Sequence, residues 1–134
     1  MYQVKNPKVV FDPYEYVPSW GESDIELNFK SNVLVLSIIF DDEETNKETC
    51  LKIFFKNAFF YKVESYPGVK AMNCIYDYGD SQSSLIEFSE SEYKESWEEH
   101  FKGLFQLSHY KIFFLNINKS VEVICEGFQV EKPF

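Results

Sequence analysis

DIELNFKSNVLVLSIIFD, residues 24–41, contains two strand patterns separated by a short polar turn. In residues 24–30, apolar and polar residues alternate, which is typical of a strand with one buried face. The dipeptide Ser31-Asn32 suits a tight turn. Residues 33–40 are apolar at almost every position, as in a central strand that is covered on both sides. The stretch therefore predicts a hairpin at the centre of a sheet.

Further strand patterns lie on both sides of this hairpin. They are predicted at residues 50–56, 59–66, 72–78, 85–88, 110–115 and 121–125. A turn at Asn57-Ala58 joins two of them, and Gly127 indicates a bulge after the last. The first twenty residues hold three prolines, so they suit an extended edge strand and not a helix. Many short strands in succession predict an antiparallel sheet built mainly from sequential hairpins.

One amphipathic helix is predicted at about residues 90–103. Ser89 precedes it as an N-cap, and Glu92, three residues later, completes a capping box. At 100° per residue, one stripe of the helix carries Tyr93, Trp97, His100, Phe101 and Leu104. We expect this stripe to pack on the sheet.

Length and composition indicate one domain. With 134 residues, of which 45% are hydrophobic, the chain has the size and apolar content of a single core. No linker or internal repeat divides it. We therefore expect a single domain, residues 1–134, of the α+β class, in which a twisted antiparallel sheet of about six to eight strands carries one helix.

The charged residues are strongly biased toward acids. The chain has thirteen lysines, no arginine and twenty-two carboxylates, which gives a net charge of -9. Without guanidinium groups the chain cannot form bidentate hydrogen bonds with phosphates, and its net charge repels nucleic acids and anionic membranes. A basic protein partner is attracted. Because neither a signal peptide nor a long apolar span is present in the sequence, we expect a cytoplasmic protein.

No constellation in the sequence predicts catalysis. The three cysteines, Cys50, Cys74 and Cys125, are widely spaced without a CxxC pair, so we expect apolar core residues and no metal site. His100 and His109 have no recognisable nucleophile beside them, and His109 suits a cap of the connection after the helix. We therefore expect a protein that is not an enzyme and that uses no cofactor.

Carboxylates gather in two places, and these are the predicted partner-binding residues. The loop after the central hairpin holds Asp41, Asp42, Glu43 and Glu44. The polar face of the helix holds Glu92, Glu95 and Glu99. Tyrosines such as Tyr14 and Tyr16 lie in segments that also hold acids, and tyrosine beside carboxylates is a composition suited to a protein interface.

The second half of the chain resembles a group of known proteins. A tryptophan-bearing helix is followed by HYKIFFLN, residues 109–116, a turn, and SVEVICEGFQV, residues 120–130. This order resembles the ending of small acidic bacterial proteins, including immunity proteins encoded beside secreted polymorphic toxins. The resemblance covers roughly residues 90–130 and implies a non-enzymatic protein that neutralises a toxin by binding it.

Two alternatives remain open at this point. A curved sheet with many aromatic residues can line a ligand cup, which would make the chain a small-molecule-binding β-rich domain. An aromatic patch can also close a homodimer, which would make the chain a structural subunit. A deep pocket with convergent polar groups would favour the first alternative.

Overall fold

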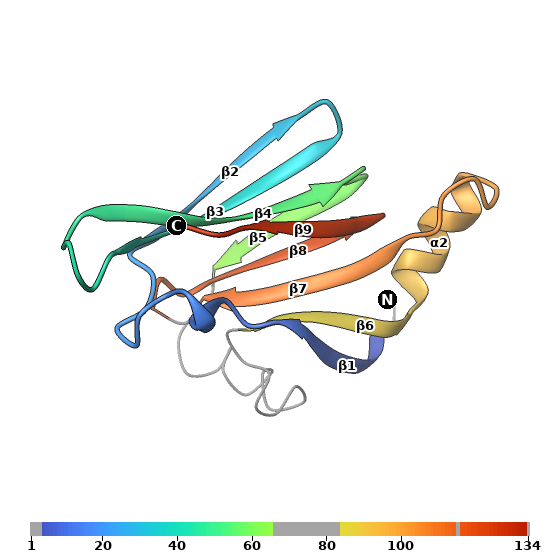
Figure 1. Cartoon of the computed structure of the whole chain (residues 1–134). Coiled ribbons are helices and arrows are strands. Elements are labelled where there is room, and N and C mark those ends of the chain that lie inside the picture. Colours follow the sequence, from blue (N-terminus) through green and yellow to red (C-terminus); the bar gives the residue numbers. More distant parts are fainter. Residues whose placement is uncertain (1–3, 66–83, 115, 134) are drawn as a thin grey trace.

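The protein is mostly β, and its described residues form nine antiparallel strands in two sheets and one short helix (Figure 1). The computed structural model describes residues 4–65, 84–114 and 116–133. The five-stranded sheet has the order β1-β6-β7-β8-β5 and the four-stranded sheet the order β2-β3-β4-β9. The strands are β1 (Val4–Phe11), β2 (Asp24–Lys30), β3 (Val33–Asp41), β4 (Glu48–Lys56), β5 (Phe60–Ser65), β6 (Leu85–Ser91), β7 (Ser108–Phe114), β8 (Lys119–Cys125) and β9 (Gly127–Glu131). The α+β class and the single sheet of six to eight strands are therefore wrong in part, because the antiparallel strands divide between two sheets.

The division into two sheets arises at one place, where two neighbouring chain segments both cross from one sheet to the other. β4 pairs with β9 and β5 pairs with β8, so β4 and β5 do not form a hairpin with each other. Between them the chain turns at Asn57, which has a φ of 49°. Between β8 and β9 the single residue Glu126 makes the same crossing. We call residues 57–59 and 126 the sheet corner.

Hydrogen bonds hold the sheet corner together. The amide Nδ2 of Asn57 donates to Oε1 of Glu126 at 2.8 Å, which links the two crossing segments directly. The backbone N–H of Glu126 donates to the carbonyl of Lys56 at 2.8 Å, and that of Phe59 to the carbonyl of Ile124 at 3.1 Å. The predicted bulge at Gly127 is thus the point where the chain enters the second sheet.

The predicted hairpin is confirmed, but its central position is wrong, because β2 lies at the edge of the four-stranded sheet. β2 and β3 pair in register from Asp24 with Ile39 to Lys30 with Val33. Ser31 and Asn32 have φ values of 54° and 65°, the left-handed conformation that a two-residue hairpin turn requires. The prediction that β3 is covered on both sides is wrong, because its alternate residues differ in burial: four are fully buried and the other four, facing outward, are partly exposed.

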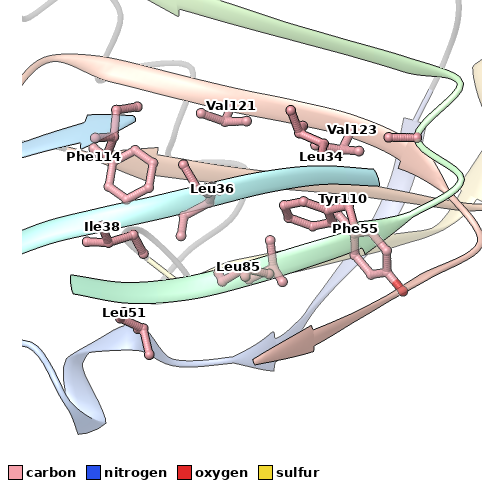
Figure 2. Close-up of a cluster of buried hydrophobic side chains, with 14 of the residues drawn as sticks. Leu34, Leu36, Ile38, Leu51, Phe55, Leu85, Tyr110, Phe114, Val121 and Val123 are labelled. Atoms are coloured by element: carbon pink, nitrogen blue, oxygen red, sulfur yellow. The ribbon is translucent and has the colours of Figure 1, made fainter. Parts of the chain in front are cut away.

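The buried core lies between the two sheets. Inward-facing side chains of β3 and β4 meet those of β7, β8 and the start of β6 (Figure 2), and the largest fully buried ones are Phe40, Phe55, Leu34, Leu36, Ile38, Leu51, Ile53, Leu85 and Ile112. Ile86, Phe88 and Phe113 form a second, smaller buried cluster. Burying one such side chain contributes about 1.5–3 kcal/mol. A single hydrogen bond contributes about 1 kcal/mol net, so apolar burial provides most of the stability.

The helix α2 (Glu92–His100) is shorter than the predicted range of 90–103. Its N-cap is Ser91, whose Oγ accepts from the N–H of Lys94 at 3.0 Å. The predicted cap, Ser89, is still within β6, where its hydroxyl donates to the carbonyl of Asn6 in β1. Because β6 is paired through Ser91, the helix begins two residues later than the capping pattern indicated.

Aromatic contacts attach α2 and the residue after it to the sheet corner and to the start of β5. Tyr93 lies edge-on to Phe60 with ring centroids 4.9 Å apart, and Phe101 packs on Phe59 at 4.5 Å. These members of the predicted stripe do face the protein. His100 and Leu104 do not: both are exposed, Leu104 at 75%, because the helix ends at His100 and the chain changes direction through Lys102 and Gly103 at positive φ. The helix lies at one end of the strands (Figure 1).

The N-terminal segment is an edge strand, as predicted. β1 lies at the edge of the five-stranded sheet and pairs with β6. The prolines do not exclude every helical turn, however, because η1 (Pro13–Glu15) is a short 3-10 helix with Asp12 as its cap. The strand predicted at residues 72–78 lies outside the described residues. No helix in the described part of the chain has the length and apolar character to cross a membrane.

Replacing Asn57 tests the sheet corner. Asn57→Ala removes the hydrogen bond to Glu126. It also places alanine at a positive φ, which alanine tolerates less well than asparagine. We therefore expect the free energy of unfolding to fall by about 1–3 kcal/mol. Asn57→Gly removes the same bond without the conformational cost and should lose less. Urea unfolding monitored by tryptophan fluorescence measures both. If both variants match the wild type, the hydrogen bond between Asn57 and Glu126 does not contribute to stability.

Candidate functional site

An open groove brings together two segments that are distant in sequence. One wall is residues 14–19, which include the last two residues of η1 and the turn after it, and the other is residues 42–45 in the loop between β3 and β4. The groove has a volume of about 790 Å³. Both segments lie at the end of the molecule opposite α2 (Figure 1). We call this feature the acidic groove.

The first wall is built by a capped turn. The Asp12 carboxylate accepts from the N–H of Tyr14 at 3.0 Å, and Pro13 occupies the first helical position, where no N–H is needed. The carbonyl of Pro13 accepts from the N–H groups of Tyr16 and Val17. Val17 is 4% exposed and belongs to the core, so it anchors the turn and leaves the two tyrosines beside the groove.

Tyr14 is fixed from below by a buried carboxylate. Its hydroxyl donates to Oε2 of Glu22 at 2.8 Å, and Glu22 is only 4% exposed. The other oxygen of Glu22, Oε1, is buried and has no hydrogen-bond partner among the described residues. This hydrogen bond to a buried acceptor holds the Tyr14 ring in position at the groove wall.

The second wall is a hairpin loop, and the side chain of its first acid, Asp42, accepts hydrogen bonds from within the loop. Oδ2 of Asp42 accepts from both the N–H and the hydroxyl of Thr45, at 3.1 and 2.9 Å. The backbone N–H of Asn46, at a φ of 55°, donates to the carbonyl of Asp42. Glu43 and Glu44 are exposed and form no ion pair with any residue in the described ranges. Their negative charge is therefore directed to solvent beside the tyrosines.

The aromatic wall already contacts a lysine. Nζ of Lys132, near the C-terminal end of the described chain, lies 5.8 Å from the centroid of the Tyr16 ring. An ammonium group over an aromatic face at this distance is attracted by the ring quadrupole. The groove thus combines a ring that accepts a lysine with the nearby carboxylates of Glu15, Glu43 and Glu44.

The structure separates the predicted partner-binding residues into three places. Asp42, Glu43 and Glu44 line the acidic groove, whereas Asp41 ends β3 and does not line it. Glu92 and Glu95 lie at the start of α2 beside a smaller depression of about 230 Å³, which Lys5 and Glu90 also line. Glu99 is exposed near the other end of the helix. The two acidic clusters therefore do not form one surface.

A buried polar network at the base of α2 was missed by sequence reasoning. His109, predicted to cap a connection, is 1% exposed in β7. Its Nδ1 lies 2.6 Å from Oγ of Ser91, and its Nε2 donates to Oε1 of Glu122 at 2.9 Å. The pairing of β7 with β8 brings His109 and Glu122 together, and periodicity alone does not give that register. Lys62 adds an ion pair to Glu122 at 3.4 Å.

This network contains the residue types of a hydrolytic triad, Ser, His and Glu, but its burial and its hydrogen bonds indicate a structural role. Ser91 and His109 are both 1% exposed, so the Ser91 hydroxyl is not accessible to a substrate in this conformation. Its oxygen also accepts from the first turn of α2. The network therefore ties the N-terminus of the helix to β7 and β8. Within the described residues, no group of three or more His, Cys, Asp or Glu side chains is arranged to hold a metal ion.

The cysteines follow the prediction in part. Cys125 is fully buried, and burial raises the pKa of its thiol to about 12. Cys50 is only partly buried in β4, so the expectation of a core position is wrong for it. Cys74 lies outside the described residues. A thiol with so high a pKa is almost entirely protonated at neutral pH and acts as a core residue.

Comparisons with known proteins give no relative: no protein-family model, curated protein or solved structure matches the chain. The resemblance of residues 90–130 to immunity proteins therefore remains a prediction.

The Glu122 carboxylate makes stability depend on pH. Burial would raise its pKa, but the hydrogen bond from His109 and the charges of Lys111 and Lys62 outweigh burial and lower the pKa below its ordinary value of 4.5. A lowered native pKa stabilises the folded state above the unfolded value, and this contribution is lost as pH falls through the native value. We therefore expect wild type to lose more stability than Glu122→Gln below about pH 4.5.

Urea unfolding of both proteins between about pH 7 and pH 3 measures this difference. Glu44→Gln, which removes an exposed carboxylate from the loop, is the control for the loss of one acid. Parallel pH curves for wild type and Glu122→Gln would contradict the role of the network.

Proposed function

We propose that this chain is a non-enzymatic interaction protein that binds a basic protein partner at the acidic groove. The observation that carries the proposal is the combination of Glu15, Glu43 and Glu44 with two tyrosine rings, one of which already contacts Lys132. Lysine side chains of a partner can place their ammonium groups near the carboxylates and their stems or charges against the rings. The net charge of -9 increases the rate of encounter with a basic protein.

Neutralisation of a toxin is the most concrete form of this proposal. The resemblance of residues 90–130 to immunity proteins supports it, and the acidic, arginine-free composition supports a basic partner over a nucleic acid. In this form the chain acts in the cytoplasm and needs no cofactor. The helix face with Glu92, Glu95 and Glu99 is then a second contact or a solvated surface, because it lies at the other end of the molecule.

The alternative of a small-molecule-binding domain has less support. The space between the sheets is filled with apolar side chains in the described part of the chain (Figure 2), and the acidic groove is open. A small-molecule site is usually a largely enclosed, mostly apolar pocket. The acidic groove is more suited to a protruding basic segment of a protein.

Charge reversal tests the groove against the helix face. The groove variant is Glu15→Lys with Glu43→Lys and Glu44→Lys, and the control is Glu92→Lys with Glu95→Lys and Glu99→Lys, which changes the net charge by the same amount. A partner is first captured with tagged wild type from native-host extract and identified by mass spectrometry. Its affinity for all three proteins is then measured by isothermal titration calorimetry.

We expect the groove variant to bind at least about tenfold more weakly, since exposed charge pairs contribute about 0.2–1 kcal/mol each. The control variant should lose much less, and wild-type affinity should fall as salt is raised. Equal losses in both variants would mean that only net charge matters. A captured partner that is acidic, or one that binds the groove variant as tightly as wild type, would also contradict the proposal.

A further inference from the structure

One edge strand of the four-stranded sheet lacks the features that usually protect such an edge. β2 lies at the edge, and no strand in the described part of the chain pairs with its other side (Figure 1). Natural edge strands are usually blocked by proline, by a bulge or by short length. The seven residues of β2 contain no proline and pair with β3 without a register shift. The backbone of this edge is therefore open to another strand.

The other edge strands that the structure describes are less suited to pairing. β1 contains Pro7, which has no N–H, and Asn6 at a φ of 55°, and its register is irregular near Val9. β9 has only five residues. In β5, the exposed charges of Lys62 and Glu64 already form an ion pair at 2.8 Å. β2 is therefore the edge at which a further strand fits best.

Alternate backbone groups of β2 point away from β3. A two-residue turn joins the two strands, so Lys30 and Val33 form the hydrogen-bonded pair that closes the hairpin. Every second residue back along β2 then bonds to β3. The backbone groups left at the free edge belong to Ile25, Leu27 and Phe29. The N–H of Ile25 agrees with this assignment, because it donates to Oδ1 of Asp24 at 2.8 Å.

The apolar layer between the sheets is open on the same side. Phe29 pairs with the fully buried Leu34 of β3 and therefore faces inward. Tyr61 and Val63 of β5 pair with buried residues of β8, so they also face inward. Phe29, Tyr61 and Val63 are nevertheless 44%, 40% and 42% exposed, and the rings of Phe29 and Tyr61 lie 5.6 Å apart. A strand added beside β2 extends the sheet over this opening.

We propose that β2 pairs with β2 of a second copy of the chain in an antiparallel, two-fold symmetric dimer. The two four-stranded sheets then form one continuous sheet. Leu27 of one copy lies opposite Leu27 of the other, and Ile25 lies opposite Phe29. Each of these pairs exchanges its free-edge N–H and C=O groups. A contact in which the same segment serves both copies is the usual form of a symmetric dimer.

The charges of β2 favour a second copy as the partner. In this register, Asp24 of each copy faces Lys30 of the other, in a pair whose side chains lie close together. Both side chains are exposed, and neither forms an ion pair with a described residue. The Phe29 carbonyl of the other copy replaces the Asp24 carboxylate as acceptor for the N–H of Ile25. The carboxylate is then available to Lys30.

Other registers are less favourable. A slip of one residue places the apolar side chains of one copy on the polar face of the other. A slip of two residues in one direction places Glu26 of one copy opposite Glu26 of the other. The same slip in the other direction places Ile25 opposite the turn residue Ser31. The register centred on Leu27 is thus the one that uses the whole strand without facing like charges.

The small contact predicts weak association. A single pair of seven-residue strands belongs to the interfaces below about 1,200 Å², which are typical of weak complexes. The net charge of -9 on each copy opposes association, so physiological salt, which screens it, is the suitable condition. The dimer is separate from the proposed binding at the acidic groove, because no residue that lines the groove lies in β2.

Sedimentation velocity at about 0.15 M salt and from about 5 to 500 µM chain tests this dimer. The mass of wild type should rise from 15.9 kDa toward twice that value with concentration. Asp24→Lys and Lys30→Glu should each dimerise at least about tenfold more weakly, because each places like charges opposite one another. A one-to-one mixture of the two should dimerise again, because the introduced lysine then faces the introduced glutamate.

Two matched controls make the same charge changes on β4, which is not in the contact. Glu48→Lys and Lys56→Glu replace exposed side chains at the two ends of this strand. Both should dimerise like wild type. Circular dichroism verifies that all four variants are folded.

Amide exchange with water, measured by NMR at both ends of the concentration range, tests the backbone pairing itself. The free-edge N–H groups of Leu27 and Phe29 should exchange more slowly at high concentration. The N–H groups of Glu26 and Asn28 are the internal reference, because they bond to β3 in the monomer and in the dimer.

Three results would overturn the proposal. The first is a wild type that stays monomeric over the whole concentration range. The second is a dimer that Asp24→Lys and Lys30→Glu weaken no more than the controls do, or whose strength their mixture does not restore. The third is a dimer in which the exchange of the Leu27 and Phe29 amides does not change, which would place the contact elsewhere.

Discussion

The bond between Asn57 and Glu126 marks the constraint on which the rest of the structure depends: two paired segments must leave one sheet for the other at the same level. β4 continues into β5 through Asn57, and β8 continues into β9 through Glu126. The two crossings lie side by side, so two neighbouring chain segments, β4–β5 and β8–β9, each run from one sheet into the other. The apolar faces of the sheets then enclose one core between them.

This corner also determines where the surfaces lie. Phe59 in the corner contacts Phe101 at the end of the helix, and Phe60 at the start of β5 contacts Tyr93, which positions α2 at one end of the strands. At the other end, the loop between β3 and β4 meets the turn that Val17 anchors in the core. The acidic groove and the acidic helix face are separated by the length of the strands for this reason. A partner that contacts both would have to span the protein.

The sequence predicted the strands well and their partners poorly. Alternation in residues 24–30 and the turn at Ser31-Asn32 were sufficient to predict the first hairpin, because side-chain period and turn conformation are local properties. The change of sheet at Asn57 is not local, since it depends on the pairing of β5 with β8 sixty residues away. The cap at Ser91 was missed for the same reason: the pairing of β6 with β1 determines where the helix can begin. Asp42, Glu43 and Glu44 were predicted as partner-binding residues and Glu15 was not, because the proximity of the loop to the turn that holds Glu15, Tyr14 and Tyr16 is a property of the tertiary structure.

The central functional claim is that the acidic groove, and not the overall negative charge, is the binding surface. Amide chemical-shift mapping by NMR during titration with a lysine-rich peptide tests it most directly, because it locates contact without any substitution. We expect the shifts to concentrate in residues 14–19 and 42–45 and to be small in residues 92–100. Shifts spread equally over all acidic segments, or concentrated on the helix, would contradict it.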